Sequence, residues 1–286
     1  MKLGSNDISS VYLGTNGVSK VYLGSTEVWS AVDPDAQAFF DRVTTAGGTL
    51  SATEQTAVNS LVVQMKADGI WSKMKAVYPM VGASAAACAQ NLKSSSFTGT
   101  FNGGWTFAST GVTPNGTSGY MDTNFAPTSF NSINDAHLSF YSRTDSTYAS
   151  YVIDIGANAN APSYNPEITI AMRHNGNTYN TLGSYSAAIS YVNNTSAFHA
   201  ISSRISSTSL KGYKNGTLQA TYTNTNTLTA FANNIFIGAD NLGGSANRFS
   251  TRQCAFASIG DGLTDTEASD FYTAVQAFQT TLSRQV

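Results

Sequence analysis

Few side chains in this sequence are of a kind that performs chemistry. Asp154 is a single carboxylate between Ile153 and Ile155, and Glu167 lies in a different predicted segment. A retaining glycosidase places two carboxylates about 5 Å apart across one cleft. Such a pair would have to be assembled here from separate strands, so the spacing does not predict hydrolase chemistry.

Nucleophilic and zinc chemistry have no better basis. No Gly-x-Ser-x-Gly elbow precedes a predicted helix. His137, His174 and His199 are isolated from one another, and Cys88 and Cys254 lie far apart in the chain. Structural zinc needs four clustered ligands. We expect no catalytic residue, no metal site of this kind, ordinary strand histidines, and two reduced, buried thiols in place of a disulfide.

The composition excludes several classes of partner. Lys and Arg number 15 against 17 Asp and Glu, which gives a net charge of −2 over 286 residues. Charged residues make up 11% of the chain, where an ordinary soluble domain has roughly 25%. No basic stripe for nucleic acid and no apolar run long enough to insert in a membrane is present. The first ten residues have no apolar signal-peptide core, so export is not expected.

An internal repeat with a period of ten residues opens the chain. Its copies are residues 2–11, 12–21 and 22–30, in which Leu3, Leu13 and Leu23 recur. Each copy has a β-rich half and a half with turn formers, which predicts strand, tight turn, strand. A sheet this short needs a partner. That partner is either the helical segment that follows or an interface with identical chains or a larger particle. The candidate interface residues are Leu3, Tyr12, Leu13, Val21, Tyr22, Leu23 and Trp29.

Helical and β-rich patterns divide the rest. Pro34 and the Ser51–Glu54 capping-box spacing predict two helices, with one more turn over residues 70–77. From about residue 92 short β-rich runs alternate with turn formers, and Thr264–Glu267 starts a final helix. We expect a mainly β protein: an N-terminal β-repeat (1–32), a short helical connector (33–91) and an antiparallel β-sandwich with a C-terminal helix (92–286).

The later β-rich runs resemble a known family. Residues 198–202, 210–216, 235–239 and 255–259, followed by residues 263–267, occur in the order seen in concanavalin-A-like lectin/glucanase sandwiches of the laminin-G type. The likeness covers roughly residues 95–286 and implies the jelly-roll form of the sandwich. Glucanases of this fold carry three acidic residues at alternate positions of one strand, and the sequence has no such strand.

The resemblance also implies two kinds of binding site. Many laminin-G-like domains hold calcium at the sandwich rim, for which Asp154 and Asp240 are the candidate ligands. The alternative is that these side chains hydrogen-bond to turn backbone. Lectins pair aromatic platforms with amide and carboxylate groups. The candidate glycan-binding residues are therefore Asn158, Tyr164, Tyr179, Tyr185 and Tyr191, although tyrosine is also ordinary strand composition.

Other segments resemble virion proteins of tailed bacteriophages. These are the three decapeptides, residues 69–79 and residues 115–123. The likeness implies a head or tail fibre, spike or decoration protein, made in the host cytoplasm and carried on the particle. It further implies other virion proteins as partners and a homo-oligomer, with a trimer as the first expectation.

The sequence thus predicts a non-enzymatic virion protein, anchored by its repeat, whose lectin-like sandwich contacts host-surface glycans. The first alternative is a depolymerase that hydrolyses host polysaccharide on the same fold. The second is a purely structural subunit of the particle that recognises no sugar.

Overall fold

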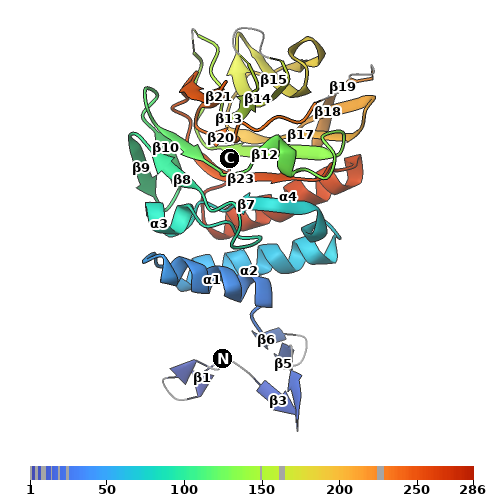
Figure 1. Cartoon of the computed structure of the whole chain (residues 1–286). Coiled ribbons are helices and arrows are strands. Elements are labelled where there is room, and N and C mark those ends of the chain that lie inside the picture. Colours follow the sequence, from blue (N-terminus) through green and yellow to red (C-terminus); the bar gives the residue numbers. More distant parts are fainter. Residues whose placement is uncertain are drawn as a thin grey trace.

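The structure of the chain is a computed structural model. It describes residues 2–3, 6–7, 11–13, 15–18, 20–23, 26–148, 150–160, 165–223 and 229–286. Two β-sheets lie face to face, three helices cover one of them, and three hairpins project beyond the helices (Figure 1). Within the described ranges, no helix has the length and apolarity that crossing a bilayer requires.

The eight-stranded sheet has the order β19-β18-β17-β12-β23-β10-β9, with β7 also paired to β23. Its pairings are antiparallel throughout. Its strands are β7 (Met74–Tyr78), β9 (Trp105–Ala108), β10 (Gly111–Pro114), β12 (Ala136–Ser142), β17 (Phe198–Ser206), β18 (Ser209–Lys214), β19 (Thr217–Tyr222) and β23 (Cys254–Gly260).

The nine-stranded sheet has the order β16-β15-β14-β13-β20-β11-β8, with β21 paired to β13 and β22 to β21. The β13–β21 pairing is parallel. Its strands are β8 (Thr100–Asn102), β11 (Tyr120–Asp122), β13 (Ile155–Asn158), β14 (Glu167–His174), β15 (Asn177–Gly183), β16 (Ile189–Val192), β20 (Phe236–Ile237), β21 (Asp240–Leu242) and β22 (Ser245–Asn247).

The central strands β12 and β23 of the eight-stranded sheet are buried on both faces. Leu138 and Phe140 of β12 point into the core between the sheets, whereas Tyr141 points into a second core shared with the helices. Strand β23 divides in the same way, with Ala257 in the first core and Phe256 in the second. The expected antiparallel β-sandwich is confirmed, and a helical layer is added to it.

That helical layer consists of α1 (Pro34–Thr45), α2 (Ala52–Ala67) and α4 (Asp265–Thr281). Both predicted capping boxes form, at Ser51–Glu54 and at Thr264–Glu267. The short helical turns are η1 (Trp71–Lys73), α3 (Ala85–Cys88), η2 (Pro127–Ser129) and η3 (Tyr185–Ala187).

The range 33–91 contributes a strand to the sandwich as well as helices. The prediction of a helical turn over residues 70–77 holds for η1 alone, because β7 begins at Met74. Strand β7 pairs with β23, with Tyr78 opposite Ala257. Helices α1 and α2 bury Phe39 and Val58 against the sheet and α4. These residues therefore belong to the packed body of the protein.

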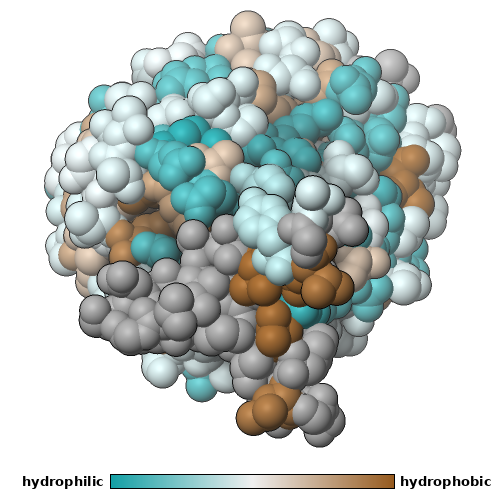
Figure 2. All heavy atoms as spheres, turned by 90° about the horizontal axis from the view of Figure 1, so that it is seen from below, coloured by the Kyte–Doolittle hydropathy of each residue, from teal (hydrophilic) through white to brown (hydrophobic). Residues whose placement is uncertain are grey.

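The N-terminal repeat forms three separate two-stranded hairpins: β1 (Lys2–Leu3) with β2 (Asn6–Asp7), β3 (Val11–Leu13) with β4 (Asn16–Val18), and β5 (Lys20–Leu23) with β6 (Thr26–Ser30). The recurring leucines occupy equivalent positions, pairing Leu3 with Asn6, Leu13 with Asn16 and Leu23 with Thr26. The hairpins lie below the helical layer and carry hydrophobic atoms on their surface (Figures 1 and 2).

Two segments of the nine-stranded sheet differ from what their residue types suggest. The β-rich run 150–156 is a regular strand only from Ile155, where β13 begins. Residues 175–191, which are rich in polar side chains, contain β15 and most of β16. Thr178 and Asn180 face inward in β15 and are fully buried. Their polar character hides the apolar alternation by which a strand is normally recognised.

Candidate functional site

A pocket of about 620 Å³ opens on the nine-stranded sheet. It is reached from the face that points away from the helices, because the inward side chains of β14, Ile168 and Ile170, fill the core behind it. Strands β14 and β15, which carry the lining residues His174 and Tyr179, lie at the end of the molecule opposite the hairpins (Figure 1). It is lined by Tyr151, His174, Asn175, Tyr179, Ala188, Ser190 and Arg248.

A tight hairpin positions one wall of the pocket. Asn175 and Gly176 join β14 to β15 with φ angles of 47° and 76°, the conformation that an Asn-Gly type I′ turn adopts. Strand alternation then directs Tyr179 outward. Ser190 of β16 lies directly opposite Tyr179 in the register. The local sequence thus places a ring and a hydroxyl side by side on the outer face.

The aromatic rings of the pocket pack mainly edge to face. Tyr151 and His174 have ring centroids 5.1 Å apart at 88°, and Tyr151 and Tyr179 are 5.7 Å apart at 75°. The guanidinium of Arg248 lies 5.4 Å from the Tyr151 ring centroid, within cation–π range. These contacts hold a half-buried aromatic wall in place before any ligand arrives.

Buried polar groups lie behind Arg248. Its Nη1 is 3.5 Å from an Asp240 carboxylate oxygen, and the Asp240 side chain is fully buried. The Asn158 amide donates to both Asp240 oxygens, at 2.7 and 2.8 Å. Glu167, also fully buried, accepts a hydrogen bond from Thr169. Burial raises the pKa of Asp240 to about 6 and the pKa of Glu167 to about 7.

The structure distributes the candidate glycan-binding residues among different environments. Tyr179 lines the pocket. Tyr191 is 7% exposed and donates to the backbone oxygen of Tyr213, so it belongs to the interior. Asn158 is fully buried against Asp240. The prediction that Tyr191 and Asn158 contact a glycan at the surface is therefore wrong. Alternation along β16 turns the Tyr191 side chain inward, and β21 pairs with β13 beside Asn158. Tyr164 and the side chain of Tyr185 lie outside the described residues.

The candidate calcium ligands already have hydrogen-bond donors. Asp154 is fully buried and accepts from Ser250, Arg252 and the Met172 amide. Asp240 is held by Asn158 and Arg248. The prediction that Asp154 lies at the sandwich rim is wrong, because Arg252 pairs with it inside the fold. Among the described residues, no group of three or more His, Cys, Asp or Glu side chains is placed to hold a metal ion.

His137, His199 and the two cysteines behave as the sequence predicted, whereas His174 lines the pocket. His137 and His199 are fully buried, and Cys88 and Cys254 are buried free thiols. His137 contacts Ser258 at 3.0 Å, but solvent does not reach this pair, since His137 lies between the sheet and α4. Its position is that of a core histidine and not that of a catalytic base.

The hairpins expose part of the candidate interface set. Tyr12, Leu13 and Leu23 are 66%, 79% and 77% exposed, and Val21 is partly buried. The side chains of Leu3, Tyr22 and Trp29 lie outside what the structure describes.

Of the seven lining residues, Tyr179 is the one among the predicted glycan-binding residues, and the other six, including Tyr151, His174 and Arg248, are not. The Asn175-Gly176 pair is a turn signal that could have placed His174 beside Tyr179. No local signal points to Arg248. It meets Tyr151 because the backbone nitrogen of Ile153 donates to the Arg248 oxygen at 3.0 Å, which joins two distant segments.

No protein-family model matches the chain, and no curated protein matches it either. Domain 4 of AbnA, an extracellular GH43 arabinanase from Geobacillus stearothermophilus in complex with arabinotriose, is similar in structure. Its TM-score is 0.52 at 17% identity, over 70% of this chain and 98% of that chain. The NanB sialidase of Streptococcus pneumoniae scores 0.43 at 16% identity, over 55% of this chain and 26% of that chain. The binding domain of botulinum neurotoxin serotype D has a TM-score of 0.47 at 13% identity, over 72% of this chain and 52% of that chain. The similarity to the arabinanase domain agrees with the β-sandwich fold described above.

Proposed function

We propose that this protein is a non-enzymatic glycan-binding protein whose pocket on the nine-stranded sheet holds the sugar. The observation that carries the proposal is the wall formed by Tyr151, Tyr179 and Arg248. Aromatic rings pack against the apolar faces of sugars, and the nearby Asn175 and Ser190 offer neutral hydrogen bonds to hydroxyls. The domain of AbnA with the same sandwich fold was solved with arabinotriose.

A glycan array followed by calorimetry tests this function. Tyr179→Ala should weaken binding by about five- to thirtyfold, because a ring contact worth about 1–2 kcal/mol is removed. Tyr12→Ala, which alters an exposed tyrosine on a hairpin, is the matched control and should bind as the unchanged chain does. Silence of the full chain on an array that includes bacterial surface polysaccharides would favour a purely structural role.

We further propose that the hairpins anchor the protein in a bacteriophage particle, as an oligomer that is most simply a trimer. Support comes from the decapeptide repeat and from the exposure of Tyr12, Leu13 and Leu23 at the end opposite the pocket. This arrangement suits a protein attached at one end that displays its pocket at the other. If a chain beginning at Asp33 keeps the full-length oligomeric state and still enters particles, the anchoring role is wrong.

Hydrolysis of the bound polysaccharide is the second candidate function. Glu167 and Asp240 lie behind the pocket, and burial raises the pKa of both carboxyls, as in a general acid. Both are fully buried, however, so neither touches the pocket space as the protein stands. Release of reducing ends from host polysaccharide, abolished in Glu167→Gln, would establish the hydrolase in place of the binding protein.

A further inference from the structure

The charge of the pocket carries information about the sugar. Among its described lining residues, Arg248 is the one that carries a permanent charge, and none is a carboxylate. Arg248 has 14% of its side chain exposed and holds one edge toward Asp240 at 3.5 Å. That distance exceeds the 2.7–2.9 Å of a tight charge-assisted hydrogen bond. Arg248 thus contacts both Asp240 and the Tyr151 ring and is also one of the residues that line the pocket.

The protonation states of Asp240 and Glu167, which lie behind Arg248, determine how much of the positive charge of Arg248 is neutralised. Their raised pKa values, about 6 for Asp240 and about 7 for Glu167, result chiefly from burial. Near pH 6 both groups hold a proton for much of the time, whereas the guanidinium stays charged. Among the described lining residues, the other titratable groups are Tyr151, His174 and Tyr179. At mildly acidic pH the pocket is thus a positively charged, aromatic cavity.

We propose, on the basis of the function proposed above, that the pocket binds an acidic saccharide, with Arg248 pairing to the carboxylate of the sugar and Tyr179 packing against its ring. A guanidinium presents paired N–H groups that match the two oxygens of a carboxylate. The cavity of about 620 Å³ is large enough for a unit of one or two sugar rings.

The test uses the full chain and matched pairs of ligands. Uronic-acid and sialic-acid oligosaccharides are each compared with the same oligosaccharide after carboxyl reduction, by calorimetry at pH 6. We expect the acidic form to bind about tenfold or more tightly. Arg248→Gln should reduce the ratio of the two affinities, acidic form to carboxyl-reduced form, to about one. Arg248→Lys keeps the charge and should retain part of the preference for the acidic form. Arg143→Gln, at an arginine beyond the end of β12 that bonds to Gln253 and the Arg284 backbone, is the control and should leave the ratio unchanged.

The outcomes separate this inference from the proposed function. Equal binding of acidic and neutral forms, or an unchanged ratio in Arg248→Gln, would overturn the acidic-sugar inference and leave glycan binding intact. Binding of neither form would overturn both. As a further readout, affinity for the acidic form should fall between pH 6 and pH 8, as Asp240 and Glu167 ionise behind Arg248. Asp240→Asn should flatten that fall, and a fall that is identical in this variant would contradict the assigned role of Asp240.

Discussion

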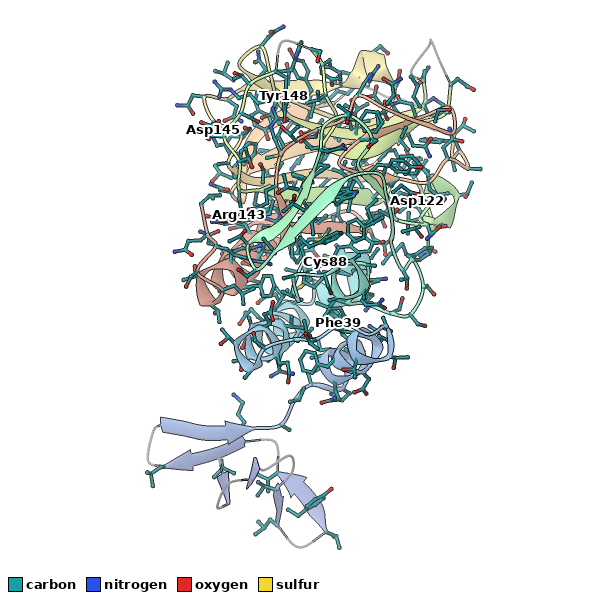
Figure 3. The ribbon with its side chains drawn as sticks, turned by 90° about the vertical axis from the view of Figure 1, so that its left-hand side faces the viewer. Phe39, Cys88, Asp122, Arg143, Asp145 and Tyr148 are labelled. Carbon is teal, nitrogen blue, oxygen red and sulfur yellow. The ribbon has the colours of Figure 1, made fainter. Side chains whose placement is uncertain are left out.

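Asp154 and Arg252 form an ion pair whose two side chains are fully buried, with 2.8 Å between their atoms. Arg252 also donates to the backbone oxygens of Ser146 and Arg173, and the Tyr148 ring lies 4.5 Å from its guanidinium. Figure 3 shows Tyr148 at the end of the molecule away from the hairpins. The pair joins the segment that precedes β13 to the segment that precedes β23.

Arg252→Gln should destabilise the protein by about 3–5 kcal/mol, because a buried carboxylate is left without its cation. The matched control is Arg173→Gln, which removes the pair with the half-exposed Asp145 and should change stability by about 1 kcal/mol or less. Denaturant unfolding at pH 7 measures both. Similar losses in the two variants would show that the buried pair has no special role.

His199 sits among aromatic rings between the eight-stranded sheet and α4, with Phe271 at 5.4 Å and Tyr141 at 5.7 Å. Neither of its ring nitrogens has a hydrogen-bond partner among the described residues. Burial lowers the pKa of His199 to about 3 and the pKa of His137 to about 4. Both rings are therefore neutral in the folded protein throughout the physiological range.

These lowered pKa values predict loss of stability in acid. An unfolded histidine takes up a proton near pH 6.5, whereas the folded ones resist protonation until about pH 4 or below. The contribution of these two neutral histidines to the free energy of unfolding is complete above pH 6.5 and is lost as pH falls toward 4. His199→Phe should be at least as stable at pH 7.5, and its free energy of unfolding should decline less between pH 6.5 and 4.5. An unchanged slope would assign the acid sensitivity to other groups.

At the scale of elements, the capping box of α4 links three parts of the fold. Glu267 accepts from the Thr264 backbone at 2.8 Å and from Lys73 at 2.7 Å, and Lys73 immediately precedes β7. The first turn of α4 is thereby tied both to its own N-terminus and to the edge of the eight-stranded sheet. The capping box that the sequence predicts at the start of this helix thus also holds the chain where β7 begins.

Thr264→Ala should lower the free energy of unfolding by about 1 kcal/mol, because the Thr264 hydroxyl no longer accepts from the Glu267 backbone nitrogen. Thr273→Ala, at an exposed position inside the same helix, is the matched control. It should be neutral or slightly stabilising, since alanine is the better helix former. Thermal unfolding of both variants decides the matter, and equal effects would argue against the cap.

At the scale of the whole molecule, the protein has two cores that share one sheet. The first lies between the sheets and includes Phe140 and Ile168, and the second lies under the helices and includes Phe39, Phe256 and Phe271. The hairpins lie outside both cores (Figure 1). The stable body of the protein therefore begins near α1, and the anchor proposed for the hairpins is separate from it.

Two truncated chains test this division. A chain of residues 33–286 should keep the melting temperature of the full chain within a few degrees, because both cores remain complete. A chain of residues 92–286 loses β7, α1 and α2, and with them the side chains of Phe39, Val58 and Val77 that complete the second core. We expect it to be insoluble or to bind a hydrophobic dye without a cooperative transition. Cooperative melting of the shorter chain at the full-length temperature would contradict the two-core description.

Features that depend on a few neighbouring residues could be predicted from the sequence. The capping boxes, the decapeptide hairpins and the Asn215-Gly216 turn, with φ angles of 50° and 72°, each follow from local hydrogen bonds or from permitted backbone angles. The spacing of β-rich runs was also enough to predict an antiparallel sandwich, since alternation and turn formers repeat along that half of the chain.

Which side of each strand is buried, and which residues contact one another, depends on the packing of distant segments. Tyr179 and Tyr191 belong to adjacent strands, yet one lines the pocket and the other is interior. Arg248 joins Tyr151 and Asp240 through pairings between distant segments. The physical reason is that burial depends on what packs against a face, and for β7, for Asn158 and for the pocket wall that partner comes from a remote part of the chain.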